Sequence, residues 1–319
     1  MKASARAFPI QGLVKYHGLR DPVRRIPFHN SISLCTGPIS TFTTVEPAAD
    51  VAASVDGVPV QGRGLERICA VMDAIREAAG SEEGFRVESR NDFPQQVGLG
   101  SSASGFAALA VAGAAAFGLN ESPAFLSQVA RIGAGSASRA VTGGVSEWKV
   151  EGEKSWSECL ATPAQLGDWK VVVPLVQHPV YTENVHAEVV ESPLFEGRLS
   201  YMDGALAKAR TAVQSGDLEA LWAIAEMDTL NLHAVTMTGS RAHITWKPAT
   251  VEVMHRVRGL RDAGTPAYFS IDTGATAYIN THAGAVDDVV SAMSDVDGVA
   301  EVLVLEPGPA AALESAHLF

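Results

Sequence analysis

The most informative stretch of the sequence reads Pro94-Gln95-Gln96-Val97-Gly98-Leu99-Gly100-Ser101-Ser102-Ala103-Ser104-Gly105, and it runs directly into an apolar segment. Its glycines let backbone N–H groups approach a ligand closely, and its serines add hydroxyl donors. A helix starting here would add positive potential at the same place. The stretch therefore predicts a phosphate cradle, and a plain Gly/Ser-rich connection into a helix stays open as the alternative. No Gly-Lys-Ser/Thr follows, which excludes a Walker A loop, and the glycine spacing does not fit a dinucleotide fingerprint.

The segment that follows this loop is uncharged from residue 93 to residue 120 and almost wholly apolar from 103 to 119. Its length is close to the roughly 17 residues that can span a bilayer. However, Ala and Gly dominate it rather than Leu and Ile. We therefore expect a tightly packed core helix and no membrane span.

Composition narrows the class of protein further. The 319 residues include 24 Lys+Arg and 36 Asp+Glu, which gives a formal net charge of −12. This charge argues against nucleic acid or an anionic membrane as a partner, but a few local cations can still hold a small anion. The three cysteines, Cys35, Cys69 and Cys159, form neither a disulfide framework nor a zinc pattern, and together with the absence of a secretory signal they predict a cytoplasmic protein.

Hydrophobic periodicity predicts a mixture of strands and helices along the whole chain. We expect helices at 64–79, 103–119, 199–215, 218–229, 248–263 and 283–293. A further helix is expected after a cap at Ser122 or Asn120. We expect strands at 13–16, 40–45, 85–89, 169–175, 267–271, 275–280 and 299–305, with a tight hairpin at Asp56-Gly57. This order favours an α+β fold. A polar stretch near 150–155 followed by a new apolar strand predicts two domains, 1–168 and 169–319.

Two further polar glycine segments occur in the chain. One reads Ile132-Gly133-Ala134-Gly135-Ser136-Ala137-Ser138-Arg139, and the other reads Ser270-Ile271-Asp272-Thr273-Gly274-Ala275-Thr276. Taken alone, Asp272 is typical of a turn. Three such segments in an otherwise apolar protein indicate a shared ligand site.

Five ordered motifs carry a family resemblance. They are Lys15-Tyr16-His17-Gly18-Leu19-Arg20-Asp21, Ile26 to Ser33, Asn91-Asp92-Phe93-Pro94 with the glycine loop, Gly133 to Arg139 with Gly143-Gly144 and Glu147-Trp148, and Asp272-Thr273-Gly274. The glycine loop resembles the ATP-binding motif of the GHMP kinase superfamily. The whole set resembles the mevalonate diphosphate decarboxylases from end to end.

The resemblance implies a fold of two α+β domains. The first would be like ribosomal protein S5 domain 2 and would carry the ATP-binding glycine loop, and the second would be ferredoxin-like. It also implies a catalytic pair, Lys15 and Asp272, facing the 3-hydroxyl of the substrate. In that chemistry ATP phosphorylates the hydroxyl, after which phosphate and CO₂ leave. The Asp would orient or deprotonate the hydroxyl, and the Lys charge would keep the Asp ionised.

The resemblance assigns further site residues. Gly98, Leu99, Gly100, Ser101, Ser102 and Ala103 would bind ATP, with Ser101 or Ser102 contacting Mg²⁺. The residues expected to contact substrate are Tyr16, Arg20, Arg67, Ser136, Ser138 and Arg139. A homodimer is also implied.

Departures from the family pattern concern the charge of the substrate. Decarboxylases that bind a diphosphate have Lys at the position of Leu19 and a Ser-Arg pair within the segment corresponding to 180–186, where this chain has no Arg. The Trp of the first motif is His17. Each charge-assisted contact is worth ~1.5–3 kcal/mol, so the missing cations favour mevalonate 5-phosphate over the 5-diphosphate. The Tyr-His-Gly-x-Arg-Asp motif is similar to that of members that decarboxylate the monophosphate.

The sequence leaves three other functions open. A decarboxylase for the 5-diphosphate would keep both catalytic residues, and so would require only a different phosphate pocket. A small-molecule kinase of the same superfamily would form ADP without CO₂. A non-enzymatic binding module would be expected to lack Lys15 or Asp272, and both are present.

Overall fold

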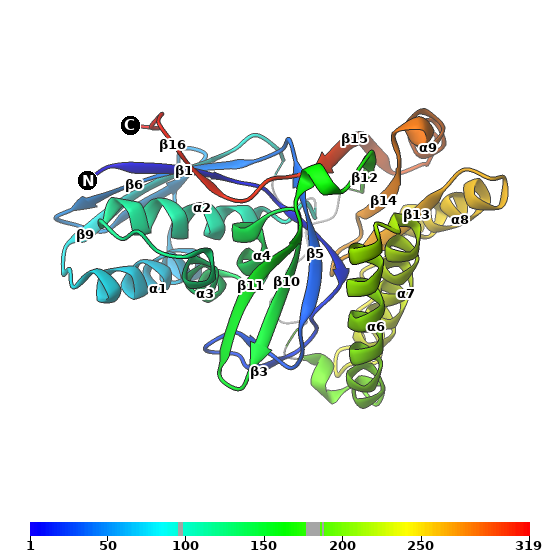
Figure 1. The fold of residues 1–319 in the computed structure, drawn as a ribbon, viewed down its shortest axis with the longest axis horizontal. Helices are drawn as coiled ribbons and strands as arrows, with labels where there is room; N and C mark the ends of the chain where they lie inside the picture. The colour runs from blue at the N-terminus through cyan, green and yellow to red at the C-terminus, as the bar shows by residue number, and fades with distance from the viewer. Residues whose placement is uncertain (95–97, 177–185, 187) are drawn as a thin grey trace.

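The computed structural model describes residues 1–94, 98–176, 186 and 188–319. Figure 1 shows two halves joined by long central strands, with the amino and carboxyl ends of the chain close together. The order of strands and helices confirms the predicted α+β class.

The first sheet lies in the amino-terminal half and is antiparallel except for the parallel pair β7 and β9. Its strands in spatial order are β16 (Ala312–Glu314), β1 (Ala3–Ala7), β6 (Thr41–Ala48), β9 (Gly84–Asn91), β7 (Ala52–Val55) and β8 (Val58–Pro59). Because β16 pairs with β1, the last strand of the chain completes the sheet that the first strand begins.

The second sheet runs through both halves (Figure 1). Its strands in order are β11 (Lys154–Ala161), β10 (Val145–Glu151), β5 (Ser31–Gly37), β15 (Val299–Pro307), β12 (Trp169–Val176), β14 (Ala277–His282) and β13 (Ala267–Ile271), and β2 (Ile10–Val14) also pairs with β5. A short hairpin joins β3 (Leu19–Asp21) and β4 (Ile26–Pro27).

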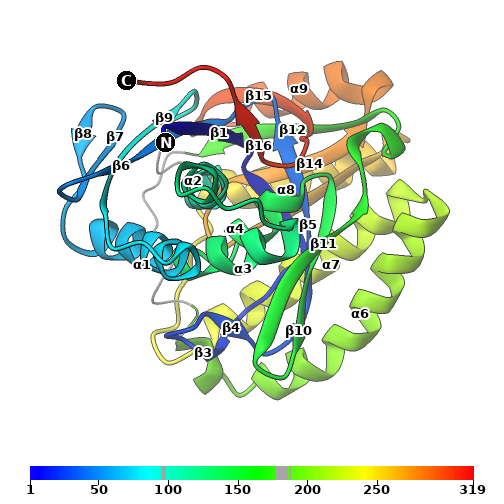
Figure 2. The same cartoon turned by 60° about the vertical axis from the view of Figure 1, so that its left-hand side comes forward.

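Helices cover both sheets. In the first half they are α1 (Gly62–Ala79), α2 (Ser101–Ala116), α3 (Pro123–Gly133) and α4 (Ala137–Thr142). In the second they are α6 (Phe195–Ser215), α7 (Leu218–Met237), α8 (Pro248–Asp262) and α9 (Val286–Ser294), with 3₁₀ turns at Pro163–Gln165, Val189–Glu191 and Ala283–Ala285. Figure 2 shows α2 in the interior of the first half, and Figure 1 shows α6 and α7 side by side.

Small residues explain how α2 packs. A Cβ on Gly113 would lie 2.8 Å from Ile75 Cδ1 and 2.9 Å from Met72 Sδ, so α1 approaches α2 where a side chain is missing. Most of α2 is buried, as expected for a core helix. Among the described residues, no helix combines the length and apolar character that crossing a membrane requires.

The core of the second half crosses the predicted boundary at residue 169. Leu13 and Ile32 from the first segment pack in one cluster with Trp169 and Trp222. The polar stretch near 150–155 is the turn of the β10–β11 hairpin and not a linker. Domains 1–168 and 169–319 remain a prediction, and strand pairing links them at β5–β15 and β1–β16.

Local signals predicted several elements well. Ser122 caps α3 by accepting a hydrogen bond from the Phe125 N–H at 3.2 Å, with Pro123 as the first helical residue. The helix predicted at 218–229 continues to Met237. The sequence missed β1, β5, β10 and β11, since these strands carry many small or polar residues.

Candidate active site

One cavity collects most of the predicted site residues. It has a volume of about 290 Å³ and lies where the ends of β2 and β13 meet the start of α2. Its walls include Lys15, Tyr16, Gly98 to Ala103, Ser136, Arg139, His186 and Asp272. Three polar glycine segments that are far apart in sequence therefore surround one space.

The glycine loop forms one end of this cavity. Gly98 has φ of 85° and Gly100 has φ of 74°, a backbone conformation that favours glycine. Among the described residues no side chain caps the amino end of α2, where the Ala103 N–H donates to the Gly100 carbonyl at 2.8 Å. The Ser101 side chain is half-buried and that of Ser102 is exposed. This arrangement suits the binding of an anion such as phosphate.

A residue of the second half fixes this loop. The Tyr278 hydroxyl donates a hydrogen bond to the Gly98 carbonyl at 2.8 Å, and Tyr278 is almost fully buried. A Cβ on Gly98 would lie 3.2 Å from Thr276 Cβ. Close contact with β14 and the turn before it therefore restricts the residue at position 98.

Lys15 and Asp272 lie at the other end of the cavity. Lys15 directly follows β2, and Asp272 directly follows β13. Gly12 lies between them: its N–H donates to Asp272 Oδ1 at 3.0 Å, and its carbonyl accepts from Ser270 Oγ at 2.6 Å. A Cβ on Gly12 would lie 2.6 Å from Asp272 Oδ1 and 2.7 Å from Lys15 Cγ. Position 12 must therefore be glycine if both side chains are to keep their places.

Burial and mutual attraction set the charges of this pair. Burial raises the pKa of Asp272, and the nearby Lys15 ammonium opposes that rise. Burial lowers the pKa of Lys15, and the carboxylates of Asp228 and Asp272 oppose that fall. A carboxylate with a raised pKa is a stronger base, and the adjacent cation favours its ionised form.

A neutral histidine supports the backbone of Asp272. His233 Nε2–H donates to the Asp272 carbonyl at 2.9 Å, and burial lowers the pKa of His233 to about 3. The imidazole is therefore uncharged at neutral pH and acts here as a hydrogen-bond donor.

Arg139 supplies a second buried cation. Its guanidinium lies 5.5 Å from the centre of the Tyr16 ring and 5.7 Å from that of Trp148, and it donates to Ser31 Oγ. Arg139 is 3% exposed, and its Nε has no hydrogen-bond partner among the described residues. Burial lowers its pKa to about 10, so it stays charged at neutral pH. A buried cation with an unpartnered donor at a cavity wall fits an anionic ligand.

Two predicted substrate contacts lie elsewhere. Arg20 is exposed on β3 and donates to the Gly152 carbonyl, because the β3–β4 hairpin carries it toward the β10–β11 turn. Ser138 is fully buried within α4, and its Oγ has no partner among the described residues. Neither Arg20 nor Ser138 is among the described residues that line the cavity, and their contact with substrate stays a prediction.

Arg67 lines a second cavity of about 280 Å³ that shares Ser101 and Ser102 with the first. Its Nε donates to the Gly133 carbonyl at 2.7 Å, and its guanidinium lies 4.7 Å from the centre of the Phe106 ring. Arg67 is therefore near the glycine loop, in a cavity that meets the Lys15 cavity at these serines.

A histidine pair lies beside Tyr16. His186 lines the cavity, stacks on Tyr16 with ring centres 4.6 Å apart, and has its Nδ1 3.3 Å from His17 Nδ1. His17 is buried, and burial lowers its pKa well below the usual value. Leu19 is half-buried on β3 and does not line the cavity. The rest of the segment expected to carry a Ser-Arg pair, residues 180–185, lies outside the described residues.

Sequence reasoning missed several residues that surround Lys15, including Gly12, Arg198, Asp228 and Thr229. Asp228 and Thr229 fall within the largely apolar pattern of α7, and no local motif marks them. Within the described part of the chain, no group of three His, Cys, Asp or Glu side chains could hold a metal ion.

Comparison with known proteins decides the family. The phosphomevalonate decarboxylase of Haloferax volcanii is 45% identical over 318 residues, which cover 95% of this chain and 98% of that protein. The chain belongs to the mevalonate diphosphate decarboxylase family. Residues 7–161 of this family member match the model described as the diphosphomevalonate decarboxylase-like N-terminal domain.

Solved structures of the family share the whole fold. Mevalonate diphosphate decarboxylase from Staphylococcus aureus superposes with a TM-score of 0.92 at 29% identity, covering 98% of each chain. MDDEF in complex with MVAPP, AMPPCP and magnesium superposes with a TM-score of 0.91 at 27% identity, covering 99% of each chain. The GHMP-type fold predicted from the five motifs is thus confirmed.

Proposed function

We propose that this protein is an ATP-dependent decarboxylase that converts mevalonate 5-phosphate into isopentenyl phosphate, CO₂, ADP and phosphate. The observation that carries the proposal is that Lys15 and Asp272 line the same cavity as the glycine loop. The family membership and the named activity of the Haloferax relative support the same conclusion.

The first chemical step is phosphorylation of the tertiary 3-hydroxyl. Asp272 orients this hydroxyl and accepts its proton while the oxygen attacks the terminal phosphoryl group of ATP. Lys15 keeps Asp272 ionised before the transfer and offsets the negative charge that develops. Gly12 holds Asp272 Oδ1 in place by its N–H.

The second step is elimination. The C3–O bond breaks and phosphate leaves with the bonding electrons. The electrons of the C1–C2 bond form the C2=C3 double bond, and the carboxylate carbon departs as CO₂. Lys15 and Arg139 are the buried cations that would stabilise the departing phosphate and hold the anionic substrate.

The residues of the glycine loop fit ATP with Mg²⁺. Gly98, Gly100 and the open amino end of α2 supply N–H donors for phosphate oxygens, and the cavity beside Arg67 offers room for the rest of the nucleotide. Ser101 and Ser102 would hold Mg²⁺, which neutralises phosphate charge when bound. The related complex that contains AMPPCP and magnesium supports this assignment.

Residues of the first motif favour a substrate with one phosphate. The family resemblance places Leu19 where diphosphate-binding relatives have Lys, and His17 and His186 lie beside Tyr16. Burial lowers the pKa of His17 well below its usual value, so His17 adds no positive charge there at neutral pH.

Product analysis tests the proposed function. Purified protein is incubated with ATP, Mg²⁺ and either mevalonate 5-phosphate or mevalonate 5-diphosphate labelled with ¹⁴C at C1, and ¹⁴CO₂ and ADP are measured together. We expect equal amounts of CO₂ and ADP and a higher kcat/KM for the monophosphate. A higher kcat/KM for the diphosphate overturns the substrate assignment, and ADP without CO₂ assigns a kinase.

We further propose that the protein is a cytoplasmic homodimer. The scattered cysteines support the location, and the family resemblance supports the dimer. Sedimentation equilibrium of the purified protein measures the oligomeric state, and a monomer mass at micromolar concentration contradicts the dimer.

A further inference from the structure

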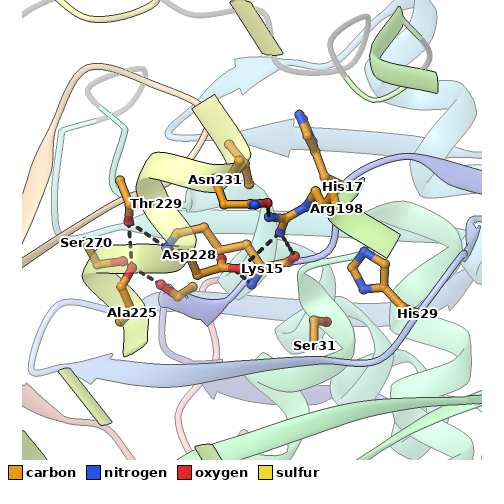
Figure 3. A network of polar contacts seen from close by, with 12 residues as sticks. Lys15, His17, His29, Ser31, Arg198, Ala225, Asp228, Thr229, Asn231 and Ser270 are labelled. Carbon is orange, nitrogen blue, oxygen red and sulfur yellow. Dashed lines mark hydrogen bonds and ion pairs between the residues drawn. The ribbon is translucent and has the colours of Figure 1, made fainter. Parts of the chain in front are cut away.

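The main chain of Lys15 is held from both sides by one buried ion pair. Its N–H donates to Asp228 Oδ2 at 2.9 Å, and its carbonyl accepts from Arg198 Nη2 at 2.6 Å. Arg198 Nη2 also lies 3.2 Å from Asp228 Oδ1, and both side chains are fully buried. Figure 3 shows Lys15 against Asp228 and Arg198, which come from the neighbouring helices α7 and α6.

The side chain of Lys15 is held by the next residue of α7. Lys15 Nζ donates to Thr229 Oγ1 at 3.0 Å, and the same oxygen accepts the Ile271 N–H at 3.1 Å while donating to the Ala225 carbonyl at 2.8 Å (Figure 3). Ile271 directly precedes Asp272. One hydroxyl group therefore fixes both the ammonium of Lys15 and the backbone that leads into Asp272.

The charges of this cluster balance. Lys15 and Arg198 are buried cations, and Asp228 is a buried anion close to both, with Asp272 the second carboxylate that acts on Lys15. Lys15 Nζ lies 3.8 Å from Asp228 Oδ2, beyond hydrogen-bond distance. Arg198 pairs with Asp228, and both Asp228 and Asp272 favour the charged form of Lys15. Removing Asp228 would leave two buried cations next to each other, which is strongly unfavourable.

A contribution to the stability of the folded protein does not explain why Arg198 and Asp228 form a buried pair. A buried ion pair is seldom more stabilising than apolar residues of similar size, since both ions must be removed from water. Among the described residues, the side-chain partners of Arg198 and Asp228 belong to the cluster around Lys15 or to the pair itself, apart from Asn231, which accepts from Arg198 Nη1 at 2.5 Å. The pair is therefore directed at the catalytic lysine.

We propose that Thr229 and the Asp228–Arg198 pair are positioning residues, which aim Lys15 at Asp272 and set the distance between them. This inference rests on the proposed function, in which Lys15 and Asp272 carry the chemistry. It assigns a role in catalysis to helices α6 and α7, which contribute no motif to the family pattern described above.

A matched set of threonine variants tests the hydroxyl. Thr229→Val keeps the side-chain volume but removes the oxygen, and Thr229→Ser keeps the oxygen. We expect Thr229→Val to lower kcat for CO₂ release by about 10²-fold, as misplacement by about 1 Å can do, with little change in KM for ATP. Thr229→Ser should restore most of the loss.

Thr211→Val serves as the matched control. Thr211 is exposed on α6, and its hydroxyl donates to the carbonyl four residues earlier, Ala207, just as that of Thr229 does. We expect its kcat to equal that of the wild type. Wild-type kcat in Thr229→Val, or a Thr229→Ser variant as slow as Thr229→Val, overturns the positioning role.

A double-mutant cycle tests the ion pair and covers the case in which Thr229→Val does not fold. If Asp228 acts through Lys15, Asp228→Asn lowers kcat by at least tenfold in the wild type and has almost no further effect in Lys15→Met. Additive losses overturn the inference. Circular dichroism and ATP affinity confirm that each variant is folded.

The outcomes separate the inference from the proposed function. If the wild type forms neither CO₂ nor ADP from either mevalonate phosphate, the proposed function fails and the positioning role falls with it. If the wild type is active and the variants behave as the control does, only the positioning role fails.

Discussion

The two ends of the cavity are built in opposite ways. The glycine-loop side, Gly98 to Ala103, is one continuous stretch whose ligand groups are mostly backbone N–H donors. The acid–base side, comprising Gly12, Lys15, Asp228, Thr229 and Asp272, comes from three distant segments and depends on side chains. A backbone site depends mainly on local conformation, with one hydrogen bond from Tyr278 to the loop, whereas a buried pair of charges needs several side-chain partners supplied by the rest of the fold. We therefore expect mutations on the acid–base side to affect the chemical step and mutations on the loop side to affect nucleotide binding.

Asp272→Asn should give the largest effect. The amide oxygen can still accept the Gly12 N–H, but the side chain can no longer take a proton. We expect kcat for CO₂ release to fall by about 10²–10⁴-fold while substrate still binds. Steady-state kinetics and calorimetric titration of substrate measure both, and a variant with wild-type kcat would remove Asp272 from the chemistry.

Gly12→Ala should give the second-largest loss of activity. The added Cβ would lie within 2.7 Å of both Asp272 Oδ1 and Lys15 Cγ, so the two side chains must move apart. We expect a loss of kcat of about 10²-fold with ATP affinity unchanged.

Gly259→Ala on α8 is the control for this change. A Cβ there meets no atom within 4 Å, so activity should stay constant and the free energy of unfolding should rise by about 0.5–1 kcal/mol. If Gly12→Ala keeps wild-type kcat, the spacing of Lys15 and Asp272 does not limit the reaction.

His233, which lies on the acid–base side of the cavity, should make the stability of the folded protein depend on pH. Its pKa is about 3 in the folded protein and near 6.5 when exposed, so between these values the unfolded chain binds a proton that the folded chain does not. The free energy of unfolding should therefore fall as pH decreases below 6.5, by about 1.4 kcal/mol per pH unit from this residue.

Denaturant titrations of the wild type and His233→Gln between pH 7 and pH 4 measure this slope. The slope of the variant should lack the contribution of one proton. The Gln amide can still donate to the Asp272 carbonyl. Equal slopes in the two proteins would mean that His233 is protonated when folded.

Tyr278→Phe should give the smallest effect and should fall on nucleotide binding. It removes the hydrogen bond to the Gly98 carbonyl, worth about 1 kcal/mol, and leaves the buried ring in place. We expect KM for ATP to rise about fivefold with kcat nearly constant. The control is Tyr268→Phe, whose hydroxyl donates to Glu219 on the surface. A fall in kcat without a change in KM would show that the two sides of the cavity are not separable.

Local patterns were sufficient for much of the fold. Apolar periodicity predicted α1, α6 and α8, and the uncharged Ala-rich run predicted the buried helix α2. Periodicity failed for β5 and β10, where small and polar residues are buried on both faces. In these strands the neighbouring strands and helices bury the polar residues, and the order of residues along the chain does not reveal that burial.

The same division holds for the site. The sequence by itself showed the glycine loop, because residue type and spacing are local properties, and the family resemblance of its motifs predicted the roles of Lys15, Asp272 and Arg139. The tertiary structure alone decided that Arg20 lies on the surface and that Ser138 is enclosed in α4. It also decided that Asp228, Arg198 and Thr229 surround Lys15, since a contact between residues about 200 positions apart leaves no periodic trace in the chain. Which buried charges form pairs depends on where the backbone places them, and only the complete fold contains that information.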